Sequence, residues 1–184
     1  LGEHVAKTMS VMFADIRGFM PLAERLGPRT VIEVLNRYFG TVERPIDEAG
    51  GFIDSYAGDE IKVLFDAAPD SALRAGIGMW RALEGFNERA RERAQPELEI
   101  GIGANTGPVV LGTVGAHNRI QCSVLGDTVN LASRIEQLTK VYRARFLVGE
   151  HTVKALESPG AFELRLVDRV AVKGRNEAVE IHEV

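Results

Sequence analysis

The chain has 184 residues, of which 45% are hydrophobic and 26% charged, proportions typical of one globular domain with a sizeable core. Its 22 lysines and arginines are outnumbered by 26 aspartates and glutamates, so the formal net charge is -4. This balance excludes a general nucleic-acid-binding protein, which normally presents a basic face. The single cysteine, Cys122, excludes an internal disulfide.

These properties predict a single domain, residues 1–184, in the cytoplasm, without a nucleic-acid partner. No apolar run approaches the roughly 18 residues of a membrane span, so no membrane contact is expected from this chain. Because Leu1 is not an initiator methionine and no signal peptide follows it, we expect the chain to be excised from a longer multidomain protein. Cys122 is expected to be a small buried side chain.

The pattern of apolar residues predicts strands and helices that alternate along the chain. Thr30 and Glu33 have the spacing of a capping box, which predicts the start of the first long helix. Asp127 is expected to cap the last helix. The expected strands cover residues 9–16, 52–56, 61–65, 98–104, 109–114, 120–125, 145–148, 162–172 and 178–184, and the expected helices cover residues 30–49, 70–93 and 127–140.

The order β-α-β-β-α-β, followed by further strands and a helix, predicts the α+β class. We expect a ferredoxin-like antiparallel sheet core with helices packed on one face, and not a doubly wound parallel sheet. The glycines of residues 101–107 do not have the spacing of a dinucleotide-binding GxGxxG motif, and a strand-like segment follows them where that motif requires a helix. A dinucleotide site is therefore rejected. None of the four histidines has a partner at zinc-like spacing.

Two acidic residues are the first candidates for chemistry. Asp15 ends the first strand and Asp59 lies near the tip of a predicted hairpin, so neighbouring strands can bring them together. Hard divalent ions such as Mg²⁺ take carboxylate oxygens together with substrate phosphates. Two carboxylates that hold two metals form the arrangement for in-line phosphoryl chemistry. Each acid taken alone also fits the plain end of a strand or a turn.

Two further patterns point toward a phosphorylated ligand. Residues 17–20 directly follow Asp15 as a glycine-containing turn into a helix, whose N–H groups can hold a phosphate. Asn130 and Arg134 share one face of a predicted helix, where an amide and a guanidinium can hold a ribose and neutralise a phosphorane-like transition state. Alone, these patterns also fit a simple strand-to-helix turn and a solvated helix face.

Together, four segments resemble the catalytic domain of class III adenylyl and guanylyl cyclases of bacterial type. They are VMFADIRGF at residues 11–19, YAGDEIKVLF at 56–65, NTGPVVLGTVG at 105–115 and SVLGDTVNLASRIE at 123–136, in the family's order and separation. The resemblance extends from about residue 5 to the end of the chain. It implies a head-to-tail homodimer with catalytic sites at the subunit interface and two divalent metal ions, Mg²⁺ or Mn²⁺, as cofactors.

The resemblance also implies the reaction and the residues that carry it. The ribose 3′ oxygen attacks the α-phosphorus of a nucleoside triphosphate, and pyrophosphate leaves. The metal ligands would be Asp15, Asp59 and the backbone carbonyl of Ile16. Asn130 and Arg134 would reach across from the partner subunit as catalytic residues. The substrate-binding positions are Gly18 and Phe19 for the phosphates, Lys173 for the terminal phosphates, and Ser55 and Ser123 for the base.

The base-reading positions depart from the family pattern. Ser55 stands where adenylyl cyclases have lysine and guanylyl cyclases typically have glutamate. Ser123 is closest to the threonine of a bacterial adenylyl cyclase subgroup, because it keeps a hydroxyl group. Met20 replaces a common threonine near the phosphates. We therefore expect ATP as the substrate and cyclic AMP as the product.

Three alternatives stay open at this point. One is a guanylyl or low-specificity cyclase, since serine at position 55 matches neither base reader. The second is a catalytically weak cyclase homology domain that serves as a nucleotide-binding or dimerisation module. The third, a diguanylate cyclase, is suggested by residues 57–60, AGDE, but the other segments fit class III better.

Overall fold

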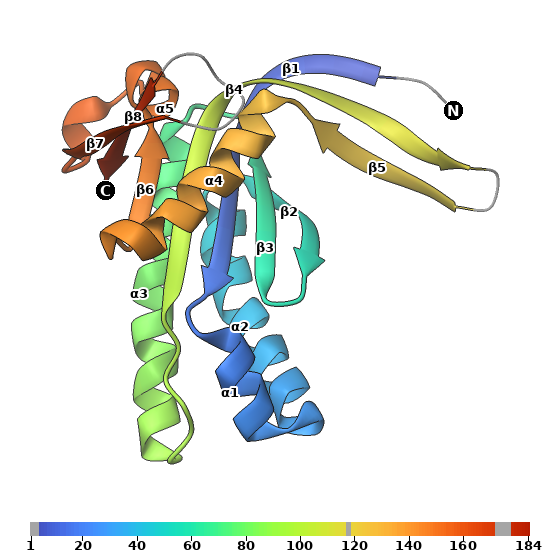
Figure 1. Ribbon diagram of the computed structural model, residues 1–184, viewed down its shortest axis with the longest axis vertical. Helices are drawn as coiled ribbons and strands as arrows, with labels where there is room; N and C mark the ends of the chain where they lie inside the picture. Colours follow the sequence, from blue (N-terminus) through green and yellow to red (C-terminus); the bar gives the residue numbers. More distant parts are fainter. Residues whose placement is uncertain (1–3, 117–118, 172–177) are drawn as a thin grey trace.

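The computed structural model describes residues 4–116, 119–171 and 178–184. Within these residues, eight strands form one sheet in the order β2-β3-β1-β4-β6-β8-β7, with β5 paired to β4 (Figure 1). The strands are β1 (His4–Ile16), β2 (Gly51–Ala57), β3 (Glu60–Phe65), β4 (Ile100–Ala116), β5 (Arg119–Leu125), β6 (Phe146–Gly149), β7 (Arg165–Ala171) and β8 (Ala178–Glu183). The helices are α1 (Phe19–Leu26), α2 (Pro28–Glu48), α3 (Asp70–Glu92), α4 (Asp127–Tyr142), α5 (Glu150–Ala155) and the 3₁₀ turn Pro159–Ala161.

Strand β1 is an interior strand, antiparallel to β3 on one side and to β4 on the other. The pair β4 and β6 is parallel, and the other pairs described are antiparallel. The order β1-α1-α2-β2-β3-α3-β4 confirms the α+β, ferredoxin-like antiparallel core expected from the sequence. None of the helices in the described ranges combines the length and the apolarity that a bilayer crossing requires.

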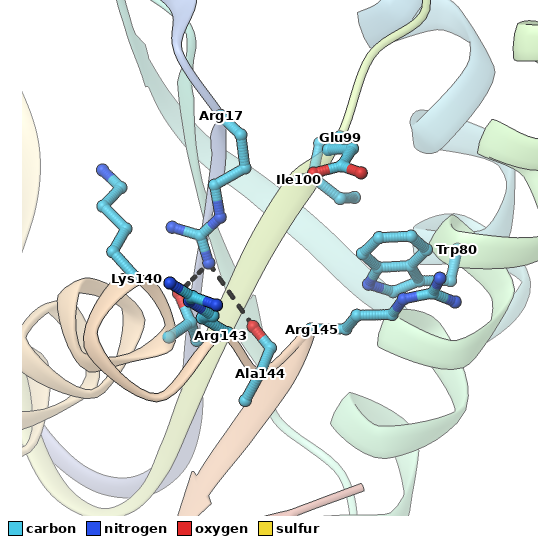
Figure 2. A pocket seen from close by; sticks show the side chains of 9 residues that line it. Arg17, Trp80, Glu99, Ile100, Lys140, Arg143, Ala144 and Arg145 are labelled. Carbon is cyan, nitrogen blue, oxygen red and sulfur yellow. Dashed lines mark hydrogen bonds between the residues drawn. The ribbon is translucent and has the colours of Figure 1, made fainter.

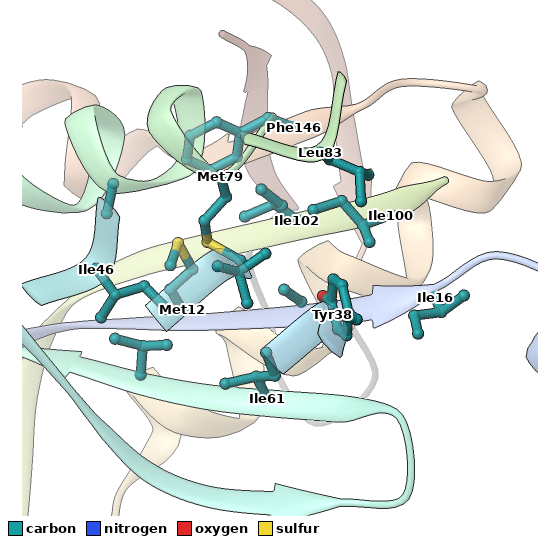
Figure 3. Packing of buried hydrophobic residues seen from close by; sticks show 14 of the residues in the cluster. Met12, Ile16, Tyr38, Ile46, Ile61, Met79, Leu83, Ile100, Ile102 and Phe146 are labelled. Atoms are coloured by element: carbon teal, nitrogen blue, oxygen red, sulfur yellow. The ribbon is translucent and has the colours of Figure 1, made fainter. Parts of the chain in front are cut away.

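Helices cover both faces of the sheet, so the expectation of one covered face is wrong. On one face, Met12 and Ile16 of β1 pack with the side chains of α2 and α3 (Figure 3). On the other face, Val11 and Phe13 of β1 pack with Ala132 of α4. The physical reason lies in β1 itself, where six consecutive residues from position 9 are buried, and a strand that is apolar on both sides needs cover on both sides.

Several expected boundaries also differ. Strand β4 joins two expected strands into one of 17 residues. Helix α2 begins at Pro28, with no side-chain hydrogen bond at its N-cap, so the capping box is wrong. Proline is favoured in the first helical turn because it lacks an N–H group, and Glu33 pairs instead with Arg29 at 3.5 Å. Gly126 is the N-cap residue of α4, and the expected cap, Asp127, is its first helical residue.

Cys122 is exposed, which corrects the expectation of a buried thiol. Strand β5 pairs with the C-terminal part of β4, and the two extend away from the body of the domain as a two-stranded ribbon (Figure 1). Cys122 lies on the part of this ribbon that no second layer covers, whereas Val124, two residues later, is buried against the core. Ser123, between these two residues, is partly buried opposite Gly112 of β4.

Candidate active site

Two strand ends bring Asp15 and Asp59 together, and their carboxyl groups share a hydrogen bond. Asp15 is the penultimate residue of β1, and Asp59 lies in the turn between β2 and β3. The turn is tight because Gly58 has a positive φ of 66°, which glycine adopts at no steric cost. The backbone N–H of Ile16 donates a hydrogen bond to Asp59 Oδ2 at 3.2 Å. The carbonyl role expected for Ile16 stays a prediction.

Lys140, in the last turn of α4, donates a hydrogen bond from Nζ to Asp15 Oδ2 at 2.7 Å. Burial alone would raise the pKa of Asp15, but hydrogen bonds from Asp59 and Lys140 bring it below its ordinary value. Burial, together with the hydrogen bond and the charge of Asp15, raises the pKa of Asp59 to about 7. The pair therefore keeps one shared proton at pH values above those at which an isolated carboxyl group loses its proton.

This pair fits a divalent metal centre. Two facing carboxylates repel each other unless a proton or a cation lies between them. Mg²⁺ and Mn²⁺ accept carboxylate oxygens, and Mg²⁺ sites commonly use one or two carboxylates and complete the shell with water and substrate phosphates. Among the described residues, no group of three or more His, Cys, Asp or Glu side chains can hold a metal. Asp15 and Asp59 therefore suit ions that arrive together with a polyphosphate.

The turn after Asp15 is built as the sequence predicts. Gly18 is the N-cap residue of α1 with φ 62° and ψ 30°, a left-handed conformation that favours glycine. Phe19 is the first residue of α1 and packs partly buried against the core. Pro21 has no N–H group and the Leu22 N–H bonds the Gly18 carbonyl at 3.3 Å, so the first turn of α1 offers a ligand beyond the acid pair the N–H groups of its first two residues.

Arg17 has a contact that the sequence did not reveal. Its guanidinium group turns toward α4, where it hydrogen-bonds the Thr139 hydroxyl and, at 3.5 Å, the Ala144 carbonyl (Figure 2). It also pairs with Glu136 at 3.6 Å. Glu136 is buried, and burial raises its pKa to about 7 in spite of Lys140 and Arg17. The contacts of Arg17 therefore tie the end of β1 to the C-terminal half of α4.

The glycines rejected as a dinucleotide motif explain how α4 reaches this position. A Cβ atom on Gly101 would lie 2.1 Å from Arg17 Nη2. A Cβ atom on Gly103 would lie 2.1 Å from the backbone nitrogen of Glu136. Both glycines belong to β4, two residues apart, and so lie on the same face of the strand. They let α4 and the Arg17 side chain lie directly on the sheet.

A basic cavity of about 410 Å³ lies beside the acid pair, and Figure 2 shows the side chains around it. Arg17, Lys140, Arg143 and Arg145 contribute four cations, and Glu99 contributes one carboxylate. The Arg145 guanidinium group lies 4.6 Å from the centre of the Trp80 ring. The positive charge next to two carboxylates suits a ligand that is a polyanion with bound metal.

Other expected site residues are not brought together within one chain. Asn130 is exposed on α4, ten residues before Lys140, which corresponds to about 15 Å along a helix. It therefore lies far from the carboxylate pair that Lys140 contacts, and Arg134, partly buried, lies between. Ser55 is on β2 and Ser123 on β5, and strands β3, β1 and β4 lie between them in the sheet. Lys173 lies outside the described residues.

Comparison with known proteins places the chain in a family. The family model for the adenylate and guanylate cyclase catalytic domain matches residues 3–182. An adenylate cyclase of Anabaena cylindrica is 45% identical over 190 residues, which cover 100% of this chain and 38% of that protein. Among solved structures, the adenylyl cyclase CyaB from P. aeruginosa has a TM-score of 0.87 at 30% identity, covering 98% of this chain and 95% of that one.

The guanylyl cyclase Cya2 has a TM-score of 0.84 at 33% identity, covering 97% of this chain and 92% of that one. The fold and the acid pair thus define a cyclase-type α+β domain. The chain belongs to the family of adenylate and guanylate cyclase catalytic domains. It spans little more than a third of the Anabaena relative.

Proposed function

We propose that this chain is the catalytic domain, within a longer protein, of a nucleotidyl cyclase that converts ATP into 3′,5′-cyclic AMP and pyrophosphate in a head-to-tail homodimer. The observation that carries the proposal is the division of the site. The acid pair Asp15 and Asp59 is assembled within one chain, whereas Asn130 and Arg134 lie ten and six residues before Lys140 on α4, away from that pair in the same chain. A second copy, turned head to tail, supplies them.

Each side chain then has a definite task. Asp15 and Asp59 would hold two divalent ions, and ions bound there would supply the positive charge that favours ionisation of the ribose 3′ hydroxyl and neutralises charge on the phosphates. The N–H groups after Gly18 bind the phosphates, because the start of α1 attracts anions. Asn130 of the partner subunit orients the ribose, and Arg134 of the partner subunit stabilises the charge of the transition state. No protein nucleophile is required.

The first test is product identification. The purified chain is incubated with ATP or GTP in the presence of Mg²⁺ or Mn²⁺, and products are separated by chromatography. We expect cyclic AMP to dominate, and the variants Asp15→Ala and Asp59→Ala to be inactive while they keep the fold. Dominant cyclic GMP would overturn the choice of base. No cyclic product at concentrations that favour dimers would support the nucleotide-binding module instead.

The shared site is tested by mixing inactive variants. In a mixture of Asp59→Ala and Arg134→Ala, random pairing makes half of the dimers mixed, and each mixed dimer has one intact site of two. We therefore expect about a quarter of the wild-type activity to return. The control mixture of Asn130→Ala and Arg134→Ala places one lesion in every site of a mixed dimer, so it stays inactive. Activity that does not return in the first mixture argues against a site shared between subunits.

A further inference from the structure

A polar cluster on the β2–β3 hairpin adds Lys62 and Asp54 to Ser55, which is an expected base-binding residue. Lys62 Nζ lies 2.6 Å from Asp54 Oδ2, and the Ser55 hydroxyl donates to the same oxygen at 3.4 Å. The side chains of Lys62 and Asp54 are only 19% and 14% exposed. Exposed ion pairs are common and worth little, but this pair is largely shielded from water on the hairpin that presents Asp59.

The register of the sheet places this cluster on the same face as the acid pair. Lys62 stands opposite Ser55 on β2 and opposite Phe13 on β1. Paired residues point their side chains to one face of a sheet, so Lys62 and Ser55 lie on the α4 face with Phe13. Asp15, two residues after Phe13 in the same strand, points to that face as well.

Asp54 joins this face through an irregularity of strand β2. Ile53 pairs with Val63 and Ser55 with Lys62, so one residue, Asp54, has no partner in the register. Such a bulge re-aims the extra side chain. Without it, the alternation of side chains along the strand would send Asp54 and Ser55 to opposite faces. The bulge therefore assembles a carboxylate, an ammonium group and a hydroxyl on the α4 face of the hairpin, the face to which Asp15 also points.

The chemistry of the cluster matches the edge of a purine base. An ammonium group has three donors and a carboxylate accepts at both oxygens, so one contact between them leaves donors and acceptors available side by side. Adenine presents an amino donor next to a ring-nitrogen acceptor, and guanine presents a carbonyl acceptor next to a ring N–H donor. A Lys–Asp pair complements such an edge, whereas the Ser55 hydroxyl alone is short and neutral.

We propose that Lys62 and Asp54 read the hydrogen-bonding edge of the purine base, with Ser55 holding the Asp54 carboxylate. This inference rests on the proposed function, because it names the base-discriminating residues of the same nucleotide site. Adenine and guanine carry their donor and acceptor in opposite order along this edge, so an ammonium group and a carboxylate fixed in one order fit one base and leave both groups unpaired against the other.

The test compares ATP and GTP in Lys62→Met and Asp54→Asn variants. The two measured ratios are kcat/KM for ATP over GTP, and the ratio of their equilibrium Kd values from displacement of a fluorescent nucleotide. We expect each substitution to change both ratios by about tenfold or more, which corresponds to about 1.4 kcal/mol of discrimination. The matched control is Lys7→Met, which removes another Lys–Asp pair, Lys7 with Asp66, at the far end of β3. Its ratios should equal those of the wild type.

A purely structural pair would weaken both nucleotides equally, so unchanged ratios in folded variants overturn the inference. Lys62→Gln provides a second variant if Lys62→Met does not fold. The two proposals fail in different ways. Turnover with unchanged ratios defeats only the base-reading role. If the variants shift the ratio of the Kd values for ATP and GTP, but the wild-type chain forms no cyclic product, only the proposed cyclase activity is defeated.

Discussion

Replacing Asp59 with asparagine is expected to stabilise the metal-free protein at alkaline pH. Burial and the neighbouring charge of Asp15 raise the pKa of Asp59 from 3.8 to about 7. Between pH 4 and 7 the folded chain thus holds a proton that the unfolded chain releases, so stability falls as pH rises through this window and stays low above it. Asparagine keeps both hydrogen bonds, because its amide donates to Asp15 and accepts from the Ile16 N–H.

The size of the effect follows from the pKa shift. A shift of about three units corresponds to about 4 kcal/mol for a fully shielded group. Asp59 is only partly buried, so solvent screening reduces this to about 1–2 kcal/mol. For a domain of this size, 1 kcal/mol moves the melting temperature by about 2–4 °C, so we expect Asp59→Asn to melt about 5 °C above the wild type at pH 8.

Thermal unfolding followed by circular dichroism at pH 5 and pH 8, with a chelator, measures this directly. The wild type should lose stability between the two values, and Asp59→Asn should lose less. Some slope remains in both, because the pKa of Glu136 is also raised to about 7. Added Mn²⁺ should stabilise the wild type at pH 8 more than the variant. Glu24→Gln, at an exposed position of α1, controls for net charge. An Asp59→Asn melting temperature at or below that of the wild type at pH 8 would refute the reasoning.

Two further outcomes test how α4 is held. Gly103→Ala should lower the free energy of unfolding by about 3 kcal/mol or more, because its Cβ would meet the backbone nitrogen of Glu136. The control is Gly40→Ala, in a helix with no atom within 4 Å of the new Cβ. This variant should melt at or above the wild-type temperature. Lys140→Met should tighten Mn²⁺ binding without nucleotide about fivefold, because it frees an Asp15 oxygen from a competing ammonium group. Equal Mn²⁺ affinity, measured by electron paramagnetic resonance, would contradict this competition.

Local patterns in the sequence predict the helices, the strands and the candidate site residues that lie at their ends. The apolar spacing predicts α2, α3 and α4 with errors of a few residues at their ends, and the Gly58-Asp59 pair predicts the hairpin turn. The sequence predicts that Asp15 and Asp59 lie close together, because each is at the end of a strand and the order of the elements makes these strands neighbours in the sheet. These features depend on residues close in the chain, where backbone geometry and side-chain period act directly.

The contacts that surround the acid pair depend on the sheet order and register, which no local pattern contains. The hydrogen bond of Lys140 to Asp15 spans 125 positions, and that of Arg17 to Thr139 spans 122. The pairing of Lys62 with Asp54 requires a bulge that shifts one strand by a residue. A shift of one residue moves a side chain to the other face of a sheet, so only the assembled tertiary structure decides which charged groups meet.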